Sequence, residues 1–154
     1  MNIVLGSDHA AFSLKSHIKE YIPSLGYAVC DVGTFSEESC DYPLFAQRAA
    51  KKILLGECEL GILICGTGIG MSLAANKIWG IRCAVCNDIF SAEMARLHND
   101  ANMLAMGARI VDEETAEQIV RIFLATSFQS GRHQKRVDMI TAIEAGENIE
   151  DELY

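Results

Sequence analysis

Short apolar runs alternate with longer amphipathic stretches along this sequence, and the alternation limits the possible folds more than any other feature. Such a pattern is typical of strands and helices that build a parallel sheet covered by helices. Residues 60–65 are apolar nearly throughout, as expected for a strand buried on both faces. We predict strands at residues 2–6, 27–32, 60–65, 82–86 and 103–106.

The stretches between these runs carry helical spacing and helix-end signals. Leu14, Ile18, Ile22 and Leu25 recur at helical spacing, and Gly26 then ends that helix. Further helices are predicted at residues 41–55, 71–78, 90–97, 112–124 and 134–145. The pattern predicts one domain over residues 1–154, a three-layer α/β/α Rossmann-like fold with a five-stranded parallel sheet and a frayed acidic tail.

The formal net charge of −8 opposes binding to nucleic acid or to anionic lipid. The apolar runs are far shorter than the ~20 residues that cross a bilayer, and no charged-then-apolar leader opens the sequence. We therefore expect a soluble, cytoplasmic protein with no nucleic-acid and no membrane partner. An anionic ligand would need locally clustered cations, which makes the positions of the arginines informative.

The six cysteines are spread along a chain large enough to form its own core, which favours free thiols over disulfides. Cys83 and Cys86 form a C-x-x-C pair, but positions three apart on a strand point to opposite faces of the sheet. We therefore expect no zinc or other metal.

Polar and glycine-rich segments follow the first, third and fifth predicted strands, at residues 6–9, 65–70 and 107–109. Because the carboxyl ends of parallel strands meet at one edge of the sheet, these segments should lie together there, where ligands bind in such folds.

The second segment carries glycines at alternate positions, Gly66, Gly68 and Gly70. Glycines let the backbone approach a ligand closely, and the N–H groups of such a turn form a site for negative charge. The alternative is a turn that serves only tight packing of strand on helix. The spacing is not that of a dinucleotide-binding fingerprint, and Lys77 lies too far away for a nucleotide-hydrolase phosphate loop.

Cys65 immediately precedes these glycines, where N–H dipoles would favour a thiolate that acts as a base or nucleophile. Its alternative interpretation is a small buried apolar side chain. Asp8 and His9 form a pair suited to sugar hydroxyls or phosphate, although Asp8 would also fit as a helix cap.

Three further polar residues lie near helix ends. His98 ends its helix, where the dipole favours a protonated ring, and a solvated helix end is the alternative. Arg132 and Arg136 are four residues apart, so both guanidinium groups can share one helix face and hold one phosphate. A solvated basic face is the usual explanation, but it is weaker in an acidic chain.

Several motifs together closely resemble type B ribose-5-phosphate isomerases from residue 2 to about residue 145. They are Gly6-Ser7-Asp8-His9-Ala10, Asp41-Tyr42-Pro43, Cys65-Gly66-Thr67-Gly68-Ile69-Gly70, Ala74-Ala75-Asn76-Lys77, His98-Asn99-Asp100 and Gly131-Arg132-His133-Gln134-Lys135-Arg136. Ala11 stands where glycine is common in the family. Met71 stands where one branch of the family has a glutamate base, so the resemblance is to the cysteine branch.

The resemblance implies a reaction through an enediolate, without metal or cofactor, in which Cys65 moves a proton between C2 and C1 of an opened sugar phosphate. Thr67 would shuttle protons between the two oxygens. A well-placed N–H donor to the developing oxyanion contributes ~3 kcal/mol. By resemblance, these donors are the N–H groups of Gly66, Gly68, Ile69 and Gly70.

The resemblance also assigns substrate contacts and a partner. His98 resembles the ring-opening acid of the family. Asp8 and Asn99 would hold sugar hydroxyls, Tyr42 would line the site, and the phosphate would be held by His9, Arg109, Arg132 and Arg136. A helix leaving the carboxyl edge of the fourth strand places His98 at the edge opposite Cys65. This agrees with the implied homodimer, or dimer of dimers, with composite sites, whose last helix and tail pack on a partner subunit.

Two alternatives stay open at the sequence level. Galactose-6-phosphate, allose-6-phosphate and tetrulose-phosphate isomerases resemble the same motifs, and the length of the pocket decides between the sugars. A non-catalytic sugar-phosphate or nucleotide-binding module would keep the glycine turn and arginines but would not need a thiolate.

Overall fold

The apolar runs form a sheet of five parallel strands in the order β2-β1-β3-β5-β4 in the computed structural model, which describes residues 1–150. The central strand β3 is buried at every position, as its continuous apolar run predicts. The strands are β1 (Asn2–Ser7), β2 (Ala28–Asp31), β3 (Leu60–Cys65), β4 (Cys83–Val85) and β5 (Met103–Gly107).

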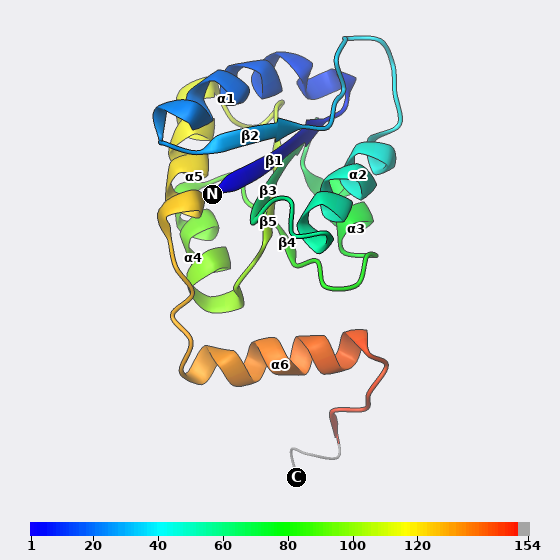
Figure 1. The fold of residues 1–154 in the computed structure, drawn as a ribbon, viewed down its shortest axis with the longest axis vertical. Helices are drawn as coiled ribbons and strands as arrows, with labels where there is room; N and C mark the ends of the chain where they lie inside the picture. Colours follow the sequence, from blue (N-terminus) through cyan, green and yellow to red (C-terminus); the bar gives the residue numbers. More distant parts are fainter. Residues whose placement is uncertain (151–154) are drawn as a thin grey trace.

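Helices cover both faces of this sheet, with α1, α4 and α5 on one side and α2 and α3 on the other (Figure 1). The three-layer α/β/α fold with a five-stranded parallel sheet is therefore confirmed. The helices are η1 (His9–Ala11), α1 (Phe12–Ser24), α2 (Tyr42–Leu54), α3 (Ile69–Ala75), α4 (Ile89–Asn99), α5 (Glu113–Ala125) and α6 (Arg132–Glu144).

The helix-end signals of the sequence act as predicted at two helices. The Asp112 side chain accepts a hydrogen bond from the N–H of Thr115 (2.8 Å) and so caps α5. After α1 ends, Gly26 adopts φ +85°, a conformation that favours glycine. Side chains of α5 such as Phe123 are fully buried against the sheet.

Element boundaries differ from the prediction at several places. Helix α3 begins at Ile69 instead of residue 71, α6 begins at Arg132 instead of residue 134, and β4 is limited to three residues. On α4 the buried residues are Ala92 and Ala95, whereas Phe90 is 69% exposed.

Of the tail, residues 151–154 lie outside the described part of the chain. No helix within residues 1–150 is long and apolar enough to span a bilayer.

A buried ion pair fixes the end of β2 near the carboxyl edge of the sheet. The ammonium group of Lys15 lies 2.8 Å from both carboxylate oxygens of Asp31, and Lys19 lies 3.0 Å from one of them. Burial acts to raise the pKa of Asp31, but hydrogen bonds from Lys15, the N–H of Gly33 and Lys19 hold it below its usual value. This anchor positions the loop that leads from β2 to α2.

Helix α6 lies outside the two helix layers, beyond the amino end of β4 and in contact with α4 (Figure 1). Both carboxylate oxygens of Glu144 accept from the N–H of Gly80 (3.0 Å), which ties its last turn to the loop before β4. Ile140 and Ile143 are 44% and 56% exposed, so part of the apolar surface of α6 is uncovered in the single chain.

Candidate active site

The segments that follow β1, β3 and β5 lie side by side at the carboxyl edge of the sheet, as the topology predicts. The N–H of Asp8 donates to the carbonyl of Ile64 (3.2 Å), and the N–H of Ala108 donates to the carbonyl of Cys65 (2.8 Å). Extending the strand ladder in this way fixes the three segments relative to one another.

The turn after β3 surrounds the Cys65 thiol with backbone N–H groups. Cys65 is 5% exposed, and its Sγ accepts from the N–H of Gly68 at 3.2 Å. Gly68 has φ +81°, which favours glycine, and the N–H of Ile69 donates to Thr67 Oγ1 (3.4 Å). Within residues 1–150 the N–H groups of Thr67 and Gly70 have no acceptor. The turn can therefore stabilise a thiolate and also offers N–H groups to an anionic oxygen.

Two buried polar atoms at the end of β1 have no partner in the described residues. They are Asp8 Oδ1 and Ser7 Oγ, and the two residues are 7% and 0% exposed. Asp8 makes no side-chain cap of the helical turn that follows it, so the capping alternative is wrong. A buried carboxylate oxygen without a partner is costly unless a ligand donates to it.

The neighbouring His9 is held by the loop before α2. Its Nδ1 accepts from the N–H of Cys40 (3.2 Å). In the neutral ring Nδ1 is then the acceptor and Nε2 carries the proton, so Nε2–H can donate to a phosphate oxygen or a sugar hydroxyl.

Tyr42 and Arg109 lie directly against the glycine turn. A Cβ added to Gly70 would be 2.7 Å from Cζ of Tyr42, and one added to Gly66 would be 3.4 Å from Nη1 of Arg109. The missing side chains therefore make room for the phenol ring and the guanidinium group. Tyr42 is 39% exposed and Arg109 is also exposed, so the single chain leaves this edge open to solvent.

His98 and Asn99 lie at the opposite, amino edge of the sheet. The carbonyl of Asn99 accepts from Nε of Arg82 (3.2 Å), and Arg82 immediately precedes β4. A strand rises ~3.3 Å per residue. The six residues of β3 therefore keep the two edges far beyond hydrogen-bond reach, and His98 does not reach Cys65 of its own chain.

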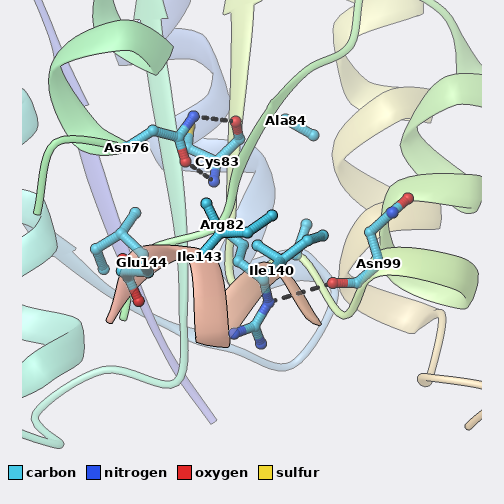
Figure 2. Close-up of a pocket in the computed structure, with 10 residues that line it drawn as sticks. Asn76, Arg82, Cys83, Ala84, Asn99, Ile140, Ile143 and Glu144 are labelled. Atoms are coloured by element: carbon cyan, nitrogen blue, oxygen red, sulfur yellow. Dashed lines mark hydrogen bonds between the residues drawn. The ribbon is translucent and has the colours of Figure 1, made fainter. Parts of the chain in front are cut away.

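Asn99 contributes to a cavity of about 440 Å³ between α6 and the amino end of β4 (Figure 2). In this view Arg82 and Glu144 lie on its walls, and Ile140 projects into it from α6. Arg132 begins α6 with its side chain exposed. Arg136, one turn further along, is also exposed, so both arginines lie on the side of the molecule that carries His98.

Sequence reasoning did not assign Asn87 or His133. Asn87 follows β4, and its Oδ1 accepts from the N–H of Gly107 (2.8 Å) at the carboxyl edge. Its position after a strand was a usable signal. His133 lies between the two arginines and stacks on His98 with ring centroids 4.1 Å apart. The sequence carries no signal for that contact.

All six cysteines are free, as predicted. Burial raises the pKa of Cys83 and of Cys86 to about 12, so neither is a candidate thiolate near neutral pH. Within residues 1–150, no cluster of three or more His, Cys, Asp or Glu side chains has the geometry to hold a metal ion.

Comparison with known proteins places this geometry in a family. The family model described as Ribose/Galactose Isomerase matches residues 3–140. Ribose-5-phosphate isomerase B of Escherichia coli is 48% identical over 146 residues, which are 95% of this chain and 98% of that protein.

Solved structures agree in fold. Ribose-5-Phosphate Isomerase B of Clostridium thermocellum is similar with a TM-score of 0.93 and 49% identity, over 95% of this chain and 99% of that one. The enzyme from Mycoplasma genitalium with bound ribulose-5-phosphate has a TM-score of 0.88 and 39% identity, over 94% and 96% of the two chains. The chain therefore belongs to the Ribose/Galactose Isomerase family.

Proposed function

We propose that this chain interconverts ribose 5-phosphate and ribulose 5-phosphate through an enediolate, with Cys65 as the base. The observation that carries the proposal is the Cys65 sulfur, 3.2 Å from the N–H of Gly68 in a turn with further unpaired N–H groups. Family membership supports the sugar phosphate as substrate, and a relative with bound ribulose-5-phosphate supports the five-carbon sugar.

The proposed reaction begins with the closed sugar. His98 donates a proton to the ring oxygen as the bond between that oxygen and C1 breaks, and the O1 hydroxyl releases its proton to solvent, which leaves the C1 aldehyde. His98 then regains a proton from solvent. The Cys65 thiolate removes the proton from C2, and the electron pair forms the enediolate while negative charge develops on O1. N–H groups of the turn stabilise that oxygen, and Thr67 carries the O2 proton to O1. Return of the proton from Cys65 to C1 completes the ketose without oxidant or metal.

The remaining proposed residues hold the substrate. Asp8, whose buried Oδ1 has no partner among residues 1–150, accepts a hydrogen bond from a sugar hydroxyl, and Asn99 holds another. Tyr42 lines the site beside Gly70. The phosphate is bound by four cationic or donor groups: His9, Arg109, Arg132 and Arg136. Charge-assisted bonds contribute about 1.5 to 3 kcal/mol each, enough to offset the repulsion of an acidic surface.

We further propose that two copies form a homodimer with composite sites. The separation of the proposed acid and the proposed base at opposite edges of one sheet supports this proposal. A second copy related by a two-fold axis brings His98, Asn99 and the α6 arginines to Cys65, and the reciprocal contact forms at once. The uncovered Ile140 and Ile143 of α6 supply apolar surface for this contact. Six free thiols support a cytoplasmic location.

A direct test compares Cys65→Ala with Cys30→Ala, which removes a partly buried thiol from β2. We expect Cys65→Ala to lose most of kcat for ribose 5-phosphate while substrate still binds, and Cys30→Ala to keep it. Near-normal turnover by Cys65→Ala in a coupled assay would reject the base. Binding without turnover by the unmutated chain would favour a non-catalytic binding module.

A complementation test addresses the composite site. Cys65→Ala and His98→Ala should each be nearly inactive, but mixed subunits restore one intact site in each heterodimer. Random exchange of equal amounts should recover about a quarter of the unmutated activity. If acid and base came from the same chain, the mixture would stay inactive.

The family also includes galactose isomerases, so the six-carbon sugar is the second candidate. The measurement that separates the two is kcat/KM for ribose 5-phosphate and for galactose 6-phosphate. We expect the five-carbon sugar to be preferred. A preference for the six-carbon sugar would keep the chemistry and replace the substrate.

A further inference from the structure

The first turn of α6 brings a second histidine onto the proposed ring-opening acid. The rings of His98 and His133 stack with centroids 4.1 Å apart and planes at 8°. His133 is 5% exposed, one of only two buried residues of α6 in the described chain, and no step of the proposed reaction uses it. The burial and stacking of His133 therefore need an explanation beyond the proposed reaction steps.

The connection between α5 and α6 fixes this stack. The N–H of Gln129 donates to the carbonyl of Leu97 on the last turn of α4 (3.0 Å). The N–H of His133 then donates to the carbonyl of Ser130 (3.1 Å). Both bonds are backbone contacts, so the place of His133 against His98 is set by the path of the chain.

The groups around the stack favour a neutral His133. Nε of Arg132 donates to Nε2 of His133 (3.4 Å), which requires an unprotonated Nε2. Burial, followed by the positive charges of His98, Arg132 and Arg136, lowers the pKa of His133. Arg96 of α4 forms an ion pair with Asp100, and this pairing neutralises the Asp100 carboxylate.

We propose that His133 is a positioning residue that holds the His98 imidazole by stacking as a neutral ring, so that His98 acts as acid in ring opening. A neutral aromatic face accommodates a neighbouring cationic ring and restricts its rotation. This inference rests on the proposed function.

The test uses two reactions that differ in their need for ring opening. Conversion of ribose 5-phosphate starts from a closed ring. Deuterium exchange from D₂O into C1 of ribulose 5-phosphate starts from an open chain and needs only the base and the phosphate site. A residue that positions His98 affects the first reaction and spares the second.

We expect His133→Ala to lower kcat for ribose 5-phosphate by ~10-fold, a part of the 10²- to 10⁴-fold that a general acid contributes, with KM nearly unchanged. Exchange into C1 should keep its rate, and His133→Phe, which retains a flat ring, should restore most of kcat. His17→Ala, which removes a histidine of α1 paired with Glu117 of α5, should change neither reaction.

Three results would overturn the inference. The first is an unchanged kcat in His133→Ala. The second is an equal loss of both reactions in His133→Ala with a raised KM, which is expected if the substitution merely moves α6 and its arginines. The third is failure of His133→Phe to restore turnover. Absence of both reactions in the unmutated chain would instead reject the proposed function, and this inference with it.

Discussion

Substitution of Gly107 by alanine tests whether the position of the turn after β3 governs catalysis. A Cβ at Gly107 would lie 2.7 Å from Cα and 2.8 Å from the carbonyl carbon of Thr67, whereas ordinary contacts begin at 3.4 Å. The atoms in the way are backbone, so the turn itself must move by more than half an ångström. Misplacement of about 1 Å costs ~10²-fold in rate. We expect kcat to fall roughly 10- to 100-fold and stability to fall by about 1–3 kcal/mol from overpacking.

Gly61→Ala is the matched control, because its added Cβ would be equally close to a neighbour, 2.8 Å from Cε of Met103. That atom is the end of a flexible side chain, and Gly61 lies at the amino end of β3, away from Cys65. Because that side chain can shift, we expect a smaller loss of stability in urea unfolding and an unchanged kcat. Equal kcat values for the two variants would refute the argument that the turn has to stay in place.

Four further outcomes are expected. Arg136→Ala should mainly raise KM, since it removes a proposed phosphate contact, and an unchanged KM would argue against that role. Phe123→Ala should lower the free energy of unfolding by about 3–5 kcal/mol in urea titration, because the ring is fully buried. Cys83 and Cys86, whose thiol pKa values are raised to about 12, should resist iodoacetamide at pH 8 in peptide mass spectra of the folded protein. Because the pKa of Asp31 is lowered in the folded state, its stabilising contribution is complete above the unfolded pKa near 3.9 and disappears as pH falls through the folded pKa. The free energy of unfolding of Asp31→Asn should therefore fall less on acid titration than that of the unmutated protein.

Local pattern predicted the sheet well, because each strand is an apolar run bounded by turn residues. The prediction was wrong where the larger side chains of a helix are not the ones that the structure buries. On α4 the large apolar Phe90 is exposed, and the structure instead buries Ala92 and Ala95, since small side chains allow close packing on the sheet. Helix α3 starts at Ile69, with Gly70 in its first turn, where a glycine-rich sequence hides the boundary.

The candidate site also contains parts that the sequence predicted and one part that it did not predict. The Cys65 turn was predictable because its residues are consecutive and its partners follow neighbouring strands. The separation of His98 from Cys65 followed from topology alone. The stack of His98 on His133 did not, because it depends on the path between α5 and α6, including Ser130 and Gly131 at φ near +60°. Propensities for such a path are too weak to fix it from sequence.

A parallel sheet offers one edge at which loops converge, and here that edge supplies the proposed base, the N–H groups and Arg109. Helix α4 follows β4 and runs antiparallel to it, so residues at the end of α4, such as His98, lie at the opposite edge of the sheet. A single copy of the fold therefore separates the proposed base from the proposed acid. Placing both on one sugar requires a second copy, and α6, tied to its own subunit through Glu144 and the His98 stack, carries the proposed phosphate-binding arginines on the same side. In the proposed dimer, the proposed acid and half of the proposed phosphate site would therefore reach the substrate together, held on one subunit by the contacts of α6.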